Sequence, residues 1–222
     1  MSRSSQIANR RSALRKSAQL DYVTKREEII HIAAKVFKQK GFHSTNINSI
    51  AEEAGIDRAS LYYYVSGKDE LFKEVVFEAT VKNVGFVESI AGSDIAALEK
   101  LRQIMIGMMK AFRDQYPYMF VFVQEEMGKI TDDSKGRATE MRSLASRFDK
   151  AVTDIIQGGL DDGTIRPVGD ARLIAFGIIG MLNWSHRWFR PDRGYSAETV
   201  GTTFADMVIA GLAGNKRRRA PK

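Results

Sequence analysis

The sequence contains no cysteine, which excludes disulfide bonds and thiolate metal sites. Its three histidines are far apart along the chain without metal-ligand spacing, so we expect neither a metal nor a cofactor. Prolines are few and no strand-like alternation of apolar residues appears, which favours helices throughout. No apolar run approaches the roughly 20 residues that cross a bilayer, and no secretion signal is present. These absences predict an all-α, soluble, cytoplasmic protein without a membrane partner.

The net charge of +7 is concentrated at the two ends of the chain. Five Arg and Lys residues precede the first acidic residue, Asp21, and five more lie in residues 216–222. We expect residues 1–20 to form a basic flexible arm and residues 214–222 to form a basic tail. The first helix is expected to run from about Lys25 to Lys40. Basic ends suit a polyanionic partner, because phosphates neutralised by Lys and Arg release counterions. For the tail, a solubilising role is the alternative.

Residues 46–68 predict two short helices joined by a tight turn. The first has an apolar face with helical spacing, formed by Ile47, Ile50, Ala51 and Ala54. Asn46 is suited to cap this helix, Gly55 can adopt the left-handed conformation that ends it, and Asp57 can cap the second helix. Further on, Ser66 with Asp69 resembles a capping box for a third helix.

The second short helix carries three consecutive tyrosines at positions 62–64. Leu61 and Val65 are one turn apart and are expected to face the core, so Tyr62 and Tyr63 point outward. A helix that lies in the major groove of DNA can use phenol groups to hold phosphate oxygens. The pattern therefore indicates a helix-turn-helix.

With its flanks, this stretch resembles the DNA-binding domain of TetR-family transcriptional repressors, closely over residues 23–75. The family pattern Ala-x-x-x-Phe-x-x-x-Gly-aromatic is matched by Ala33, Phe37, Gly41 and Phe42. The pattern Ile-Ala-x-x-Ala-Gly-apolar is matched by Ile50, Ala51, Ala54, Gly55 and Ile56. The pattern Leu-Tyr-x-x-apolar-x-x-Lys is matched by Leu61, Tyr62, Val65 and Lys68.

The resemblance implies a three-helix DNA-binding domain in residues 21–75 and a helical ligand-binding and dimerisation domain in residues 76–213, with about nine helices in all. The DNA-binding residues that it implies are Thr45, Asn46, Asn48, Arg58, Ala59, Ser60, Tyr62, Tyr63, Tyr64 and Lys68. Arg58, Ala59 and Asn48 would contact base edges, and most of the others would hold the DNA backbone. For Tyr64, packing in the domain is the alternative.

The resemblance also implies a small-molecule effector among the helices of residues 94–190. The candidate ligand-binding residues are Met105, Met109, Phe112, Tyr116, Phe120, Met127, Phe148, Trp184, Arg187 and Trp188. They predict a largely apolar effector, although methionine and aromatic residues at helical spacing also form ordinary cores. Residues 183–191 are similar to family members that sense acyl-CoA thioesters, where an arginine beside aromatic rings can hold a phosphate or stack on adenine. A surface arginine beside two interface tryptophans is the alternative.

The leading hypothesis is a homodimeric repressor that binds a near-palindromic operator in double-stranded DNA and is released by a small-molecule effector. The family pairs its last two helices across a two-fold axis, and these helices are apolar on more than one face here. A non-sensing architectural or partner-binding DNA protein is the alternative. An enzyme has the least support, because no catalytic constellation appears in the sequence.

Overall fold

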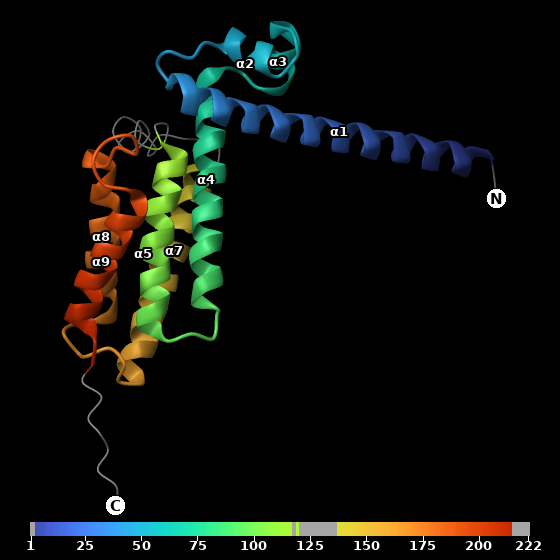
Figure 1. Ribbon diagram of the computed structural model, residues 1–222. Helices are drawn as coiled ribbons and strands as arrows, with labels where there is room; N and C mark the ends of the chain where they lie inside the picture. The colour runs from blue at the N-terminus through green and yellow to red at the C-terminus, as the bar shows by residue number, and fades with distance from the viewer. Residues whose placement is uncertain (1–2, 117–118, 120–136, 215–222) are drawn as a thin grey trace, which may run out of the picture. The chain divides into compact units, whose positions relative to one another are not determined.

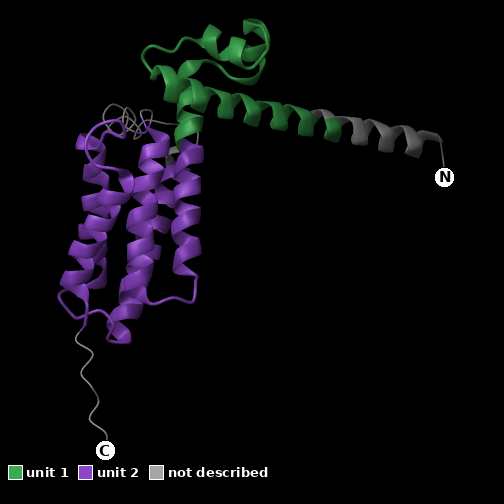
Figure 2. Cartoon of the chain, in the orientation of Figure 1, with its two compact units in different colours: residues 1–76 green, residues 77–222 purple. Residues whose placement is uncertain are grey.

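The computed structural model describes residues 3–116, 119 and 137–214. Within these residues the regular secondary structure is helical, and two isolated β-bridges join Ile165 to Ala213 and Arg190 to Arg193. The predicted all-α fold is therefore confirmed. The chain divides into two compact units, unit 1 (residues 1–76) and unit 2 (residues 77–222), which Figure 2 shows in different colours. No helix in the described ranges is long and apolar enough to cross a membrane.

The described residues contain eight helices, close to the nine or so expected (Figure 1). Another expected helix lies in residues 117–127, which are outside the described residues except for Met119. Helix α4 (Lys68–Ala91) contributes its residues up to Val76 to unit 1 and the remainder to unit 2.

Unit 1 contains the beginning of α4 and three further helices: α1 (Arg3–Lys40), α2 (Ile47–Glu53) and α3 (Arg58–Tyr64). Helix α1 begins at Arg3 and not near Lys25, so the residues expected to form a flexible arm are helical from Arg3 onward. The physical reason is that the first glycine or proline in the chain is Gly41. Alanine, leucine, arginine, lysine and glutamine before it all favour a helix, and none of them stops one.

An aromatic cluster forms part of the core of unit 1. Phe37 of α1 and Phe72 of α4 are buried and pack edge to face, with their ring centroids 5.7 Å apart. Phe42, just after α1, lies 4.3 Å from Phe72. Such ring pairs contribute about 0.5–1.5 kcal/mol each beyond the burial of area. Helices α2 and α3 bury Ile50 and Leu61, and this anchors the two short helices.

Unit 2 is a helical bundle built around α5 (Figure 1). Its helices, besides the end of α4, are α5 (Ala97–Gln115), α7 (Arg137–Asp161), α8 (Ala171–Trp188) and α9 (Ala197–Leu212). The buried face of α5 has helical spacing and consists mainly of Leu101, Ile104, Met105, Met108, Met109 and Phe112. Asn83 of α4 and Gln115 of α5 exchange two hydrogen bonds, of 3.2 and 2.8 Å, between their buried amides. This pair ties α4 to α5 within unit 2.

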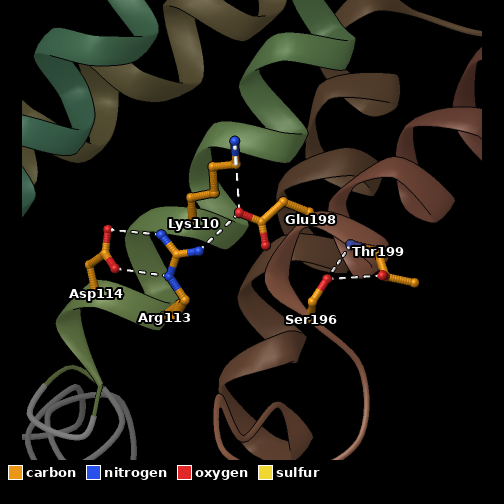
Figure 3. A network of polar contacts seen from close by, with 6 residues as sticks. All are labelled: Lys110, Arg113, Asp114, Ser196, Glu198 and Thr199. Carbon is orange, nitrogen blue, oxygen red and sulfur yellow. Dashed lines mark hydrogen bonds and ion pairs between the residues drawn. The ribbon is translucent and has the colours of Figure 1, made fainter.

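Helices α5 and α9 approach each other at Gly201. A Cβ atom at this position would lie 2.7 Å from the Cα of Ile106 and 3.2 Å from the carbonyl oxygen of Met105. Only glycine therefore fits here without a shift of the backbone. At the beginning of α9, Glu198 forms ion pairs with Arg113, at an N···O distance of 2.9 Å, and with Lys110, at 3.8 Å (Figure 3). Exposed ion pairs add little stability, so the backbone packing holds the two helices together.

Replacing Gly201 by alanine is expected to lower the free energy of unfolding by about 1–3 kcal/mol, because the new methyl group overpacks the contact between α5 and α9. The matched control is Gly211→Ala in the same helix, where an added Cβ meets nothing within 4 Å. Alanine there should leave stability unchanged or raise it by up to about 1 kcal/mol. Urea unfolding followed by circular dichroism measures both effects. Equal stability of Gly201→Ala and the wild type would contradict the close approach.

Candidate nucleic-acid interface and effector site

Helices α2 and α3 form a helix-turn-helix whose two helix beginnings are capped as predicted. The side chain of Asn46 accepts a 2.8 Å hydrogen bond from the Ser49 amide at the beginning of α2. Asp57 accepts hydrogen bonds from the amide of Ser60 at 2.8 Å and from its hydroxyl at 2.7 Å. These bonds lower the pKa of Asp57. Between the helices Gly55 has a φ of +65°, which turns the chain.

The exposed side of this motif carries most of the predicted DNA-binding residues. Those classed as exposed are Asn46, Asn48, Arg58, Ala59, Tyr62 and Tyr63, and Ser60 is partly exposed beside them. The ring of Tyr63 is the most open of the three tyrosines, with an exposed fraction of 71%. Arg58 donates a 3.2 Å hydrogen bond to the Tyr62 hydroxyl, and its guanidinium lies 5.4 Å from the centre of that ring. The structure therefore brings the Arg58 guanidinium and the Tyr62 phenol together on α3, and the Tyr63 phenol is exposed next to them in the sequence.

Two predicted residues are placed differently. Thr45 is 2% exposed, and its hydroxyl donates a 2.7 Å hydrogen bond to the Gly41 carbonyl, so its side chain lies inside unit 1. Lys68 is partly buried at the beginning of α4. Its ammonium donates a 3.1 Å hydrogen bond to the Phe42 carbonyl and lies 4.3 Å from the centre of the Phe42 ring. The Lys68 ammonium is thus held against the loop that follows α1.

Tyr22 of α1 was missing from the predicted set, yet it packs against the tyrosines of α3. It stacks on Tyr64 with ring centroids 5.2 Å apart and meets Tyr63 edge to face at 5.5 Å. The signal for it was present in the sequence, because Tyr22, Ile29 and Ala33 share one helical face. The first helix was expected to begin near Lys25, so Tyr22 was not assigned to it. Partial burial of Tyr64 in this cluster fits the packing role considered for it.

An ion pair fixes the beginning of α4 against α1. Arg26 contacts Glu70 at 3.0 Å and Glu74 at 3.5 Å. The Ser66 amide and hydroxyl each donate a 2.7 Å hydrogen bond to Glu70. Ser66 is therefore paired with Glu70 and not with Asp69, because Arg26 holds Glu70 beside it. Burial raises the pKa of Glu70, but the bonds from Ser66 and Arg26 outweigh it, and the net result is a lowered pKa.

The predicted effector residues of unit 2 do not form one group. Met105, Met109 and Phe112 are buried together in the core around α5, and Phe148 of α7 packs partly buried against it. Tyr116 lies just beyond α5, 5.9 Å from the Arg190 guanidinium. Phe120 and Met127 lie outside the described residues.

Trp184 and Arg187 lie on the surface of α8. The exposed fraction of Trp184 is 60%, and the Arg187 guanidinium lies 4.8 Å from the centre of its ring. Trp188 is also exposed and meets Phe204 of α9 with ring centroids 6.2 Å apart. The tryptophan–arginine pair predicted from the sequence is present, but it is exposed at the surface whereas Met105 and Met109 are buried.

From the sequence, His186 was considered only as a metal ligand or a catalytic group and supported as neither, and its burial was missed. It is 9% exposed, and its ring centroid lies 3.9 Å from that of Phe112. Burial lowers its pKa to about 4, so the imidazole is neutral at pH 7. The available signal was spacing, since His186 falls on the same helical face as Ile178 and Leu182. Across the described ranges no three His, Asp or Glu side chains gather as a metal site.

An apolar stripe runs along the exposed face of α8. We define the α8 stripe as Leu173, Phe176, Gly177, Gly180 and Trp184, which share one side of the helix. Leu173, Phe176 and Trp184 are exposed. A Cβ added at either glycine meets no other atom within 4 Å. Met207 of α9 is exposed as well. Unit 2 therefore has an apolar surface that its own core does not use.

A cleft of about 440 Å³ lies between the end of α4, the beginning of α5 and α7. Three charged side chains line it, and each already has a partner: Lys100 donates to the Ala91 carbonyl, Asp154 pairs with Lys150, and Asp162 accepts from Thr164. None of the predicted effector residues lines this cleft.

Comparison with known proteins relates both units to bacterial regulators. Residues 29–75 match the family described as "Bacterial regulatory proteins, tetR family", and residues 94–212 match "Tetracyclin repressor-like, C-terminal domain". The HTH-type transcriptional repressor KstR2 of Mycolicibacterium smegmatis is 29% identical over 190 residues, which cover 85% of this chain and 91% of that protein.

Solved structures agree with these matches. The ketosteroid transcriptional regulator KstR2 of Mycobacterium tuberculosis has a TM-score of 0.67 at 25% identity, covering 86% of this chain and 95% of that chain. The fold is also shared with FadR from Bacillus subtilis in complex with stearoyl-CoA, with a TM-score of 0.63 at 18% identity, covering 83% and 98%. Since the match to the C-terminal domain alone spans more than half of the sequence, the chain belongs to the TetR family of bacterial regulatory proteins.

Proposed function

We propose that the protein is a transcriptional repressor that binds a near-palindromic DNA operator as a homodimer and is released by a small-molecule effector. The observation that carries the proposal is the capped α2–α3 motif, which presents Arg58, Tyr62 and Tyr63 together on one exposed surface. The chain that contains this motif is similar to a transcriptional repressor of Mycolicibacterium smegmatis.

Each exposed residue of α3 has a role suited to its chemistry. The Arg58 guanidinium can donate two hydrogen bonds to the O6 and N7 atoms of guanine. Ala59 can contact a thymine methyl, and Asn48 of α2 can reach a base edge or a phosphate. Tyr62, Tyr63, Ser60, Asn46 and Lys68 would hold the DNA backbone. Tyr64 is partly buried and Thr45 is buried, so we propose that both residues pack within unit 1.

Operator affinity would depend on geometry more than on charge. Residues 21–75 contain eight Lys and Arg against nine Asp and Glu. This segment alone has a weak general attraction to phosphates, so the five basic residues of residues 1–20 and two α3 helices at a fixed spacing are needed to bind DNA tightly. The spacing of the half-sites is set by the dimer, about 34 Å for each turn of DNA.

The α8 stripe is the proposed dimer contact. Two copies can pair it across a two-fold axis, so that Leu173 and Phe176 are covered by the second copy while Trp184, at the far end of the stripe, stays available to the effector. The absence of side chains at Gly177 and Gly180 permits a close approach. Exposed apolar surface of this kind commonly marks an interface.

The effector is proposed to be a largely apolar molecule, carried as an acyl-CoA thioester. The methionines and Phe112 around α5 offer apolar contacts, and methionine adapts readily to a ligand. Trp184 and Arg187 offer an aromatic face and a cation for a CoA nucleotide. FadR from Bacillus subtilis, which shares the fold, was solved with stearoyl-CoA.

Helix α4 is the proposed route from the effector to DNA, because it contributes residues to both units. The Asn83–Gln115 pair couples it to α5, which carries the buried methionines. An effector that displaces α5 would therefore move α4 and change the separation of the two α3 helices. This is coupling between two distinct sites.

The operator contacts can be separated by substitution. Tyr63→Ala and Lys68→Ala should weaken binding to all DNA sequences about equally, because they remove backbone contacts. Arg58→Ala should relax the preference at one base position, with a cost of about 1–3 kcal/mol. Tyr63→Phe keeps the ring contacts and tests the hydroxyl alone, and Tyr195→Ala is a control for an exposed tyrosine outside unit 1. Selection of operators from random DNA measures the preference. An unchanged selected sequence for Arg58→Ala would exclude the base-reading role.

Phe176→Glu is expected to give a monomer, because it buries a carboxylate in the paired α8 stripes. Operator affinity should then fall by about 100-fold or more, since the two half-sites are no longer linked. Val81→Glu, which alters an exposed apolar residue of α4, is the matched control and should remain dimeric. Light scattering after gel filtration measures the mass. A dimeric Phe176→Glu protein would place the contact elsewhere.

The whole proposal is tested by identifying what releases the protein from DNA. Mass spectrometry of the purified protein reports any small molecule that co-purifies. A gel shift on its own promoter, with and without that compound and a series of acyl-CoA thioesters, then measures release. We expect at least one of these compounds to release the DNA. If none does, the helical body only dimerises, and the protein is an architectural or partner-binding DNA protein.

A further inference from the structure

His186 differs from the other buried polar side chains of the described residues. Five such side chains are buried, and four of them are hydrogen-bonded: Thr45 to Gly41, Asn83 to Gln115 and back, and Ser185 to the Met181 carbonyl at 3.2 Å. Within the described part of the chain, the His186 imidazole has a ring contact with Phe112 and no hydrogen bond. Buried polar groups in native proteins nearly always have a partner, so this exception needs a reason.

The imidazole nitrogens are not sealed inside the core. In the described part of the chain, no fully enclosed side-chain nitrogen or oxygen lacks a hydrogen bond. Because His186 makes none among the described residues, its nitrogens are not fully enclosed and belong to the 9% of the residue that is exposed. At pH 7 the neutral ring has one nitrogen that donates a hydrogen bond and one that accepts, so it can meet a polar group in either role.

Apolar side chains are prominent around His186. Phe112 of α5 lies against its ring, and Leu182 of α8 and Phe189, just after α8, are buried before and after it in the chain. A single polar group among apolar side chains is the usual composition of a small-molecule site, where it fixes the orientation of the ligand. A charged ligand group would be costly to bury there, whereas a neutral oxygen would not.

We propose that His186 orients the effector by donating a hydrogen bond to a carbonyl oxygen of the ligand, with the apolar part of the ligand seated against Phe112. The proposal rests on the proposed function and deepens it, because it assigns the ligand class. The effector presents an uncharged carbonyl, such as that of a thioester, at this point and does not present a free carboxylate. The site then differs from the exposed Trp184–Arg187 pair, which would contact a different part of the same molecule.

The test uses the full-length protein with His186→Phe, which keeps the ring and removes both nitrogens. Operator affinity without ligand should stay within about 2-fold of the wild type. Release of DNA by acyl-CoA thioesters should need about 10-fold more compound, as expected for one lost hydrogen bond. His186→Gln, which restores an amide donor, should recover part of the response. Ser185→Ala is the matched control, since its hydroxyl is satisfied within α8, and should respond like the wild type.

Thermal melting without ligand provides a second measurement. The melting temperature of His186→Phe should equal or exceed that of the wild type, because an unsatisfied polar group is replaced by an apolar one. A lower melting temperature with an unchanged acyl-CoA response would show a structural role for His186 and overturn the proposal. If acyl-CoA releases the wild type and His186→Phe equally, only the role of His186 fails. If no acyl-CoA thioester releases or stabilises the wild type, the ligand class fails together with the effector part of the proposed function.

Discussion

The contact between α5 and α9 at Gly201 is the constraint on which unit 2 depends. Without a side chain at this position, the α9 backbone can lie directly on α5, and the buried face of α5 can pack against its neighbouring helices. Helix α8 packs one side, including Ala175, Ile178 and Leu182, into the same core. The opposite side of α8 then carries large apolar side chains that stay exposed, such as Leu173, Phe176 and Trp184. A helix that is apolar on two sides but buried on one needs a second surface, and this explains why unit 2 exposes large apolar side chains that an isolated bundle would avoid.

Much of unit 1 could be predicted from the sequence because its signals are local. The caps at Asn46 and Asp57 and the turn at Gly55 depend on residues only a few positions apart, and all of them are present in the structure. The beginning of α1 could not be predicted in the same way. A helix end is recognised by a residue that stops it, and no glycine or proline occurs before Gly41. The choice of Glu70 over Asp69 as the partner of Ser66 also depended on a distant residue, Arg26, which lies in another helix.

The effector region was harder to predict, because spacing shows which residues share a helical face but not what lies opposite that face. Trp184 and His186 are two positions apart in α8, and the structure exposes the first and buries the second. Residue type alone does not give this order, since tryptophan is on average more buried than histidine. Their placement follows from the packing of α8 on α5, which is a contact between residues more than 60 positions apart in the sequence, such as Phe112 and His186.

The cluster of Tyr22, Tyr63 and Tyr64 has a consequence for how the specificity of this protein can be altered or transferred. Helix α3, the proposed recognition helix, is only seven residues long, and its tyrosines pack against a residue of another helix. The ring of Tyr22, from a helix more than 30 residues earlier in the chain, supports both of its neighbours. Grafting α3 alone onto another helix-turn-helix scaffold would leave these phenols without their support. If α3 reads DNA as proposed, the smallest portable unit is therefore α3 together with the segment of α1 around Tyr22.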